Sequence, residues 1–406
     1  MSLPWVLRHP TLRALTALSA LWALSFGLTI PFLTVTARDR GVSVDAIGLI
    51  AASYLLAQIF LQAPFGALSD RIGRTGLLAA GIAVFSVATA SFVFADSMST
   101  FMVLRVMQGL GFAMGLPSYR AMVADVTAPN ERGRAYAAMG TAYSSGLLLG
   151  PALGGFLVGL VGRDALFLLT AAIEAGLAVG VILLLRGVAR PATPMGEGMR
   201  VPLAALLTRP LLGAFLLAFV GHFPMGFIES IWALYVLDRG GSELVVGISF
   251  STIAISKLVL QPLGGRLADR GDQPRLLLAG FLAMAMAIVA YGLMPWAAGI
   301  IAFGFIEGAA AALAYPALDA FLASKADPRI QGRVQGTFSS LMMAGATVSA
   351  VGGALLYGVS PGLPFVVGGM AMGMLTCVAF VLIRGAMPSY SVQQAGPSGM
   401  SESLQP

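Results

Sequence analysis

Charged residues are scarce in this sequence. Asp, Glu, Lys and Arg make up 10% of its 406 residues, and 58% of the residues are hydrophobic. An ordinary soluble domain carries about 25% charged residues. Because a fold dissolved in water could not bury so much apolar surface, we expect most of that surface to face lipid.

Cysteine and histidine are nearly missing, which excludes several kinds of site. Cys377 stands alone, so the chain cannot build a disulfide framework or a cysteine-based metal site. The two histidines, His9 and His222, are too few for a zinc centre, and the sequence contains neither an H-E-x-x-H motif nor a hydrolase triad. We therefore predict no metal, no cofactor and no enzymatic activity.

Long apolar segments fill most of the chain. Crossing the hydrocarbon of a bilayer takes roughly 20 residues of helix, and a helix satisfies its own backbone there. The segments and their short connectors predict an all-α membrane protein with twelve transmembrane helices. We expect these spans at residues 11–37, 44–65, 75–95, 98–120, 135–161, 164–185, 210–237, 244–263, 274–294, 296–320, 334–358 and 361–384.

The basic residues are distributed unevenly between the two sides of the membrane. If the N-terminus lies inside, 18 of the 24 Lys and Arg residues fall on the cytoplasmic side. This positive-inside bias predicts a multi-pass protein of a bacterial inner membrane with both termini in the cytoplasm. The net charge of +6 then reflects orientation, and no nucleic-acid partner is expected. The basic residues that fall on the outer side are Arg38, Arg40, Arg163 and Arg239.

The sequence repeats itself at an offset of 199 residues. At this offset the segment around Asp70 falls on the segment around Asp269, and the match runs without a gap from residue 66 to residue 134. An even number of spans in each unit makes the repeat parallel. We expect six-helix bundles at residues 1–186 and 209–386, a Gly- and Pro-rich cytoplasmic linker at 187–208, and a disordered tail at 387–406.

Four motifs carry a family resemblance. The segment "GALSDRIGRTG" begins at Gly66, and its degenerate copy "GRLADRGDQPRLL" begins at Gly265. Span 4 contains "LRVMQGLGFAMG" and span 5 contains "GLLLGPALGGFL". Together they resemble the Major Facilitator Superfamily, and the span-5 motif resembles its 12-helix drug:proton antiporter branch. The resemblance implies two pseudo-symmetric bundles, each of inverted 3+3 repeats, that rock around a central substrate site.

The resemblance also suggests a conformational latch at the first motif. It implies that Arg74 pairs with an acid after span 4, where Asp125 stands. We interpret Asp70 as a cap for a neighbouring helix and the glycines as parts of a tight turn, so that the cluster holds the cytoplasmic helix ends together while the protein faces outward. A merely solvated turn is the alternative. The latch residues are Gly66, Asp70, Arg71, Gly73, Arg74 and Asp125, with Asp269 and Arg270 in a second copy that lacks the Arg74–Asp125 pair.

Span 5 carries glycine at every fourth position. Gly146, Gly150 and Gly154 form one stripe, and small residues let helices pack closely in lipid. Pro151 removes a backbone hydrogen bond and is expected to bend the helix. Packing alone explains the stripe, whereas the resemblance implies that it forms a seal between spans 2 and 5 on the outer side.

Polar residues within the spans are candidates for substrate binding and proton coupling. A charge at mid-bilayer costs roughly 2.5–3.5 kcal/mol or more unless it is paired or hydrated. The resemblance implies a proton-coupling role for Arg105, with a structural ion pair as the alternative. Glu174 lies in a peripheral span, where contact with lipid competes with a packing role. The candidates are Trp22, Arg105, Gln108, Glu174, His222, Glu229, Trp232, Lys257, Glu307 and Tyr315.

Two acids are the strongest candidates for carrying protons. Glu229 shares a predicted helix face with His222 and Trp232, and Glu307 lies in the middle of span 10. Lys257 could neutralise either acid. Span 1 contains no acid, unlike that of many proton-coupled drug exporters, so Glu229 or Glu307 would have to carry the protons here.

These features predict a secondary active transporter. We expect a monomer that exports small amphipathic, drug-like compounds by alternating access in exchange for protons. The alternative is a proton-coupled or facilitative transporter of a sugar, an amino acid or an organic anion, with Arg105 and Lys257 binding an anionic substrate. A membrane sensor or a lipid-processing enzyme is a more remote alternative, because the sequence shows no catalytic constellation.

Overall fold

The computed structural model describes residues 9–128, 131–185, 207–270, 272–325 and 331–384. Within these residues, twelve helices are long and apolar enough to cross a membrane, which confirms the expected fold class. Most of the linker expected at 187–208 and all of the tail expected at 387–406 lie outside the described residues.

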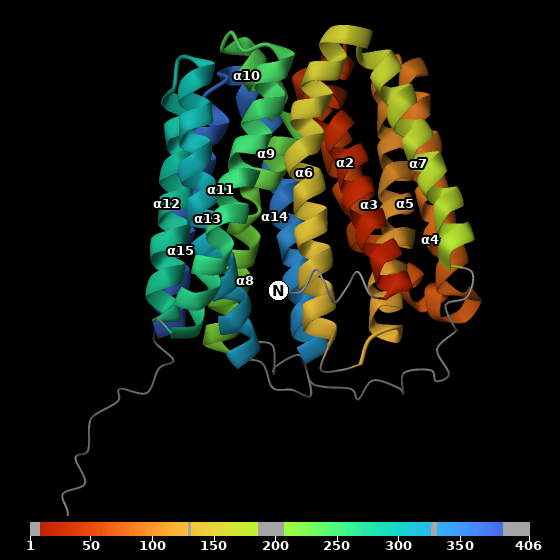
Figure 1. Cartoon of the computed structure of the whole chain (residues 1–406). Helices are drawn as coiled ribbons and strands as arrows, with labels where there is room; N and C mark the ends of the chain where they lie inside the picture. Colours follow the sequence, from red (N-terminus) through yellow and green to blue (C-terminus); the bar gives the residue numbers. More distant parts are fainter. Residues whose placement is uncertain (1–8, 129–130, 186–206, 271, 326–330, 385–406) are drawn as a thin grey trace, which may run out of the picture.

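The first half of the chain forms one bundle, drawn in red to yellow in Figure 1. Its fourth helix is preceded by a short 3₁₀ turn, η1 (Phe92–Phe94). The helices are α2 (Pro10–Asp39), α3 (Val44–Ile72), α4 (Arg74–Ser91), α5 (Met98–Asp125), α6 (Arg132–Val161) and α7 (Arg163–Leu185).

The second half forms a second bundle beside the first (Figure 1). Its first span consists of three consecutive short helices, and each of the others is a single helix. The helices are α8 (Arg209–Gly221), α9 (Phe223–Ser230), α10 (Trp232–Asp238), α11 (Glu243–Arg270), α12 (Gln273–Leu293), α13 (Ala297–Lys325), α14 (Gln331–Val359) and α15 (Leu363–Arg384).

The seventh span is broken, although the sequence predicts one continuous helix. It is interrupted at His222 and again at Ile231. Pro224, in the first turn of α9, has no backbone N–H and cannot continue the hydrogen bonding of α8. The three residues of the predicted common face contact different neighbours: His222 packs on Tyr315, Glu229 pairs with Arg105 and Trp232 packs on Tyr291.

The charged segment after span 2 is mostly helical, and this corrects the predicted loop. Helix α3 continues through Gly66 and Asp70 to Ile72, so Gly66 is not part of a turn. Gly73 makes the turn alone, with a φ of 105° that favours glycine. Gly66 instead faces α5, where a Cβ at its position would lie 3.6 Å from Pro117.

The glycine stripe of α6 packs against α2, the first span. A Cβ on Gly150 would lie 2.7 Å from the carbonyl oxygen of Leu24 and 2.8 Å from the Cα of Gly27, and Gly146 and Gly154 meet the same helix. The stripe therefore does not form the expected seal between spans 2 and 5, because it packs against span 1 instead of span 2. Helix α6 continues through Pro151 to Val161.

The two bundles meet closely at only one end. We call the ends of the molecule the Asp39 end, where α2 stops, and the Asp70 end, where α3 stops. Near the Asp39 end α3 packs on α14, and a Cβ on Gly48 would lie 2.9 Å from the Ala350 carbonyl oxygen. Toward the Asp70 end, the described residues show no ion pair and no close glycine contact between the bundles. The structure is thus closed at the Asp39 end and open at the Asp70 end.

Candidate functional site

A buried ion pair joins the two bundles. Arg105 of α5 pairs through Nη2 with Oε2 of Glu229, which lies on α9. The exposed fractions of the two residues are 1% and 2%. The Arg105 guanidinium also donates from Nη1 to Oε1 of Gln108 at 3.0 Å and lies 4.0 Å from the centre of the Tyr54 ring. Three of the predicted site residues, Arg105, Gln108 and Glu229, therefore meet at one place.

Glycine on α5 brings Tyr54 to the arginine. A Cβ on Gly109 would lie 2.8 Å from the Tyr54 carbonyl oxygen, so a side chain there would push α3 away from α5. Arg105 and Gln108 are three residues apart and share a face of α5. The close packing and this spacing together place a ring and an amide beside the guanidinium.

The ion pair keeps unused hydrogen-bonding capacity. Among the described residues, Nε of Arg105 and Oε1 of Glu229 have no hydrogen-bond partner. A buried charge that loses its partner is unstable by several kcal/mol. Arg105 or Glu229 can therefore exchange its partner for another charged group. Neither residue would be stable in the buried site as an ionised side chain without a partner.

A cluster of aromatic and methionine side chains extends from Tyr54, the ring that lies against Arg105. In the first bundle, Phe112 packs on Trp22 with ring centroids 5.6 Å apart and on Tyr54 at 6.3 Å. From the second bundle, Met225 and Met343 pack against the same cluster. Methionine adapts to irregular shapes and aromatic rings attract cations, so the surroundings suit an apolar molecule with a positive charge.

Glu307 lies in a separate place inside the second bundle. It accepts a hydrogen bond from the Tyr291 hydroxyl at 2.6 Å and borders a small cavity of about 10 Å³ that Trp232 also lines. Glu307 occupies the position equivalent to Gln108 in the 199-residue repeat, and Gln108 likewise bonds a neighbouring helix through Thr89. The structure thus separates the two acids that the sequence treats as equivalent.

Lys257 neutralises neither acid through a direct ion pair. Its Nζ lies 4.9 Å from the centre of the Tyr315 ring, and among the described residues it has no ion-pair partner. The His222 ring packs on the same tyrosine at 5.8 Å, and the Tyr315 hydroxyl donates to the Gly221 carbonyl at 2.6 Å. These three candidates form a cluster of their own beside the break between α8 and α9.

Glu174 does not face lipid. Its exposed fraction is 0%, and it points from α7 into the first bundle. The lipid-facing alternative for this residue is therefore wrong.

The latch residues form ion pairs within one bundle. Arg74 joins Asp70 at 3.1 Å and also pairs with Asp125 of α5. These bonds lie within the first bundle and exist while the Asp70 end is open. Helix α4 begins at Arg74 without a side-chain cap, so Asp70 does not cap that helix. Arg71 is exposed.

The second copy of the latch has no equivalent pair. Gln273 donates to the Ala268 carbonyl at 3.3 Å, and Ser324 donates to the Phe321 carbonyl at 2.8 Å. Each residue thus bonds its own local backbone instead of bridging two helices. Asp269 is exposed, and the side chain of Arg270 lies outside what the structure describes.

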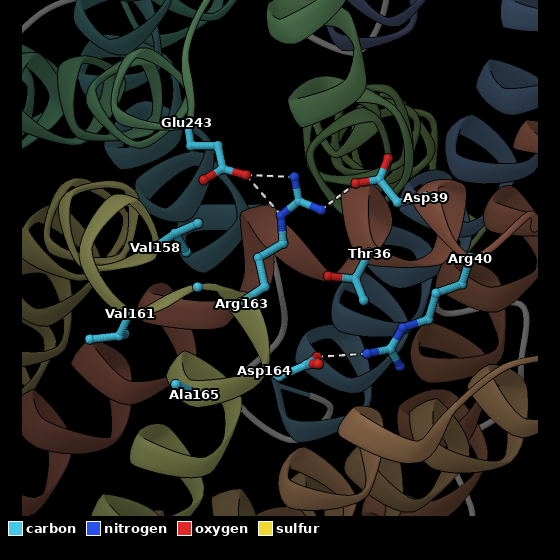
Figure 2. Close-up of a pocket in the computed structure, with 10 residues that line it drawn as sticks. Thr36, Asp39, Arg40, Val158, Val161, Arg163, Asp164, Ala165 and Glu243 are labelled. Atoms are coloured by element: carbon cyan, nitrogen blue, oxygen red, sulfur yellow. Dashed lines mark hydrogen bonds and ion pairs between the residues drawn. The ribbon is translucent and has the colours of Figure 1, made fainter.

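A charge cluster at the Asp39 end was not predicted. Arg163, at the start of α7, donates to Glu243 of the second bundle at 2.5 Å and also pairs with Asp39. Figure 2 shows these residues around a surface pocket of about 530 Å³. Nearby, Arg38 bridges to Asp238 of the second bundle at 2.8 Å. The sequence did carry a signal for this cluster. Arg38 and Arg163 are among the few basic residues that the positive-inside pattern places on the outer side of the membrane.

Replacing Arg163 by Ala is expected to loosen the closed end. The replacement removes one ion pair between the bundles, Arg163–Glu243. Such a pair near the surface contributes about 0.2–1 kcal/mol, so the population open at the Asp39 end should rise roughly 1.4- to 5-fold. The measurement is the rate at which a membrane-impermeant maleimide labels a cysteine placed at Val158, in a Cys377→Ser background.

The matched control for this prediction is Arg40→Ala. Arg40 bonds Asp164 and the carbonyls of Phe92 and Ala95, which all belong to the first bundle. Its loss should leave the labelling rate unchanged. Equal rates in wild type and Arg163→Ala would show that the cross-bundle pair does not hold this end closed.

Comparison with known proteins places both halves of the chain in one family. The family model described as Major Facilitator Superfamily matches residues 15–235 and 214–404. The quinolone resistance protein NorA of Staphylococcus aureus (strain Mu50) is 26% identical over 223 residues, which cover 53% of this chain and 56% of NorA. Multidrug resistance protein 1 of Bacillus subtilis is 26% identical over 242 residues, covering 58% of this chain and 62% of that protein. The chain thus spans little more than half the length of the curated relatives it matches.

Solved structures share the fold. A bacterial homolog of the human lysosomal transporter Spinster, in an inward-facing and unoccupied conformation, superposes with a TM-score of 0.71 at 17% identity, covering 92% of this chain and 96% of that chain. A POT family transporter in complex with a thioalcohol-conjugated peptide reaches a TM-score of 0.77 at 13% identity, with the same coverage. Because both halves match one family model and the fold is that of solved transporters, the chain belongs to the Major Facilitator Superfamily and is a membrane transporter rather than an enzyme.

Proposed function

We propose that this transporter exports amphipathic, drug-like cations in exchange for protons. The observation that carries the proposal is the Arg105–Glu229 pair, a buried carboxylate held by one cation from the opposite bundle. The names of the partial relatives, a quinolone resistance protein and a multidrug resistance protein, support a role in efflux.

The sidedness follows from the basic residues. The excess of Lys and Arg near the Asp70 end assigns this end to the cytoplasm, with both termini on that side. The described structure is then open toward the inside and closed toward the outside, where Arg163 and Arg38 join the bundles. In this state a monomer in the inner membrane would accept its substrate from the cytoplasm or from the inner leaflet.

Glu229 is the proposed coupling group because three partners compete for it. In the described state Arg105 holds it. A cationic substrate that enters among Tyr54, Phe112 and Met225 would take the place of Arg105, and a proton would remove the charge altogether. Because a proton and a cation cannot both neutralise one carboxylate, binding of one opposes binding of the other. Inward proton movement supplies about 2.3 kcal/mol per charge for each 100 mV.

Efflux from proteoliposomes tests this function. Ethidium, a fluorescent amphipathic cation, would be followed under an imposed pH gradient for wild type, Glu229→Gln, Glu307→Gln and the double variant. We expect Glu229→Gln to lower pH-driven efflux by about 100-fold or more, the loss of an interaction worth roughly 3 kcal/mol. Glu307→Gln should have a smaller effect, because Glu307 bonds Tyr291 inside one bundle. Efflux that persists in the double variant would overturn the proposal.

A further inference from the structure

Glu174 is a buried carboxyl that the proposed coupling does not use. It lies on α7, whose neighbours in the first bundle are α2, α4, α6 and η1. The side chains that face its carboxyl are the hydroxyls of Ser25 on α2 and Thr89 on α4. No charged group of the described residues faces it, and the charged residues of its own helix, Arg163 and Asp164, are ten or more positions away, about 15 Å along the axis.

In the described state the two hydroxyls face Glu174 as hydrogen-bond acceptors, because each already donates its hydrogen to a backbone carbonyl. Ser25 donates its single hydrogen to the Trp22 carbonyl at 2.9 Å, and Thr89 donates to the Phe85 carbonyl at 3.0 Å. Neither oxygen of Glu174 receives a hydrogen bond from the described residues. An ionised carboxylate has only lone pairs to offer, whereas a protonated carboxyl has one O–H to donate. Burial without a cation also disfavours the ionised form. The site is therefore built for a carboxyl that carries its proton.

A hydrogen-bonded chain leads from this site to the ion pair between the bundles. Thr89 Oγ1 accepts from Nε2 of Gln108 at 3.1 Å, and Oε1 of the same amide accepts from Nη1 of Arg105 at 3.0 Å. A change in the partner of Arg105 therefore reaches Thr89 through one side chain. The hydroxyl of Thr89 can then rotate from the Phe85 carbonyl toward Glu174 and stabilise a carboxylate.

Glu229 cannot supply a proton in the described state, because it is already ionised and paired with Arg105. An entering cation that takes Glu229 leaves the charge of Arg105 without a counterion. Buried charge has to be balanced. Glu174 lies close to the hydrogen-bonded chain of Thr89, Gln108 and Arg105, and its carboxyl can become negatively charged. Its O–H bond breaks, the electron pair stays on the carboxylate, and the proton passes to water.

We propose that Glu174 is a second proton-binding site, which releases its proton when a cationic substrate displaces Arg105 from Glu229. The proposal rests on the proposed function, because it assumes that the substrate binds at Glu229. One proton is then released for each cation that binds, so the net charge of the buried site does not change.

Proton release on dye binding tests the proposal. The purified full-length protein in lipid nanodiscs, in weakly buffered solution near neutral pH, is titrated with ethidium while bound dye and released protons are measured together. Wild type should release about one proton for each bound ethidium. Glu174→Gln should bind the dye and release almost none, because an amide can donate to Ser25 and Thr89 but cannot lose a proton. Glu174→Asp, which keeps a carboxyl, should recover part of the release.

The controls separate this proposal from the proposed function. Thr170→Val removes a buried hydroxyl one turn away on α7 and should release protons as wild type does. Proton release by Glu174→Gln equal to that of wild type would overturn the proposal, as would a wild type that binds ethidium and releases none. Tight ethidium binding by Glu229→Gln would instead overturn the proposed function. Infrared difference spectra test the proposal even if the Glu174→Gln variant fails to fold. When ethidium is added, wild type should lose an absorption band of a protonated carboxyl, and the frequency of this band should shift in Thr89→Val. Absence of that loss in wild type would contradict the proposal.

Discussion

Replacing Arg105 by Ala is expected to lower the free energy of unfolding by about 3–5 kcal/mol and to abolish efflux. Glu229, with 2% of its surface exposed, would be left as a buried carboxylate without a cation. The replacement also removes the guanidinium that lies on the Tyr54 ring. The measurement is denaturant or thermal unfolding of the purified protein in detergent, together with ethidium efflux from proteoliposomes.

A double variant separates charge from packing. Arg105→Met combined with Glu229→Met removes both charges and fills the same space with flexible apolar side chains. We expect it to recover most of the lost stability, because replacing a buried ion pair by apolar residues is often neutral or better, while efflux stays absent. Arg71→Ala, at an exposed position of α3, serves as the control and should change stability by less than about 0.5 kcal/mol. A double variant as unstable as the single one would contradict this account.

Replacing Gly150 by Leu is expected to disrupt the first bundle. A Cβ there would lie 2.7 Å from the Leu24 carbonyl oxygen and 2.8 Å from the Cα of Gly27, and both are backbone atoms that cannot rotate away. Helices α2 and α6 would have to separate along the contact that also aligns Gly146 and Gly154. Overpacking usually costs about 1–3 kcal/mol, and more where backbone must move. We expect little folded protein, measured as the monodisperse fraction on size-exclusion chromatography.

The same helix supplies the control. Gly159 lies nine residues further along α6 and faces open space among the described residues. Gly159→Leu therefore adds the same side chain where no backbone opposes it, and its yield and stability should match those of wild type. If both leucine variants behaved alike, helix propensity rather than the contact with α2 would explain the role of Gly150.

Several features of the fold follow from the sequence because they depend on local composition. The twelve spans are set by runs of apolar residues, and the structure confirms them. The Arg74–Asp125 pair, expected from the family resemblance, is present because Gly73 turns the chain back just before Arg74 and places it beside the end of α5. The error there concerns the local backbone: α3 stays helical to Ile72, since a charged segment outside the hydrocarbon has no need to unwind.

The sequence was least informative where one helix meets another. A glycine stripe indicates close packing but does not say against which helix, and here the partner is α2 rather than α3. A predicted helix face does not say which neighbour each residue meets, and here Glu229 meets the other bundle whereas Trp232 packs on Tyr291 within its own.

The sequence by itself determined that the chain is a duplicated twelve-helix membrane transporter, and it identified the charges within the spans as the candidates for function. Only the tertiary structure decided how those charges pair. Arg105 meets Glu229, 124 residues away, while Lys257 stays with Tyr315 and Glu307 with Tyr291. The physical reason is that periodicity fixes which face of a helix a residue occupies, whereas its partner depends on how two separately folded bundles dock and on where a helix breaks.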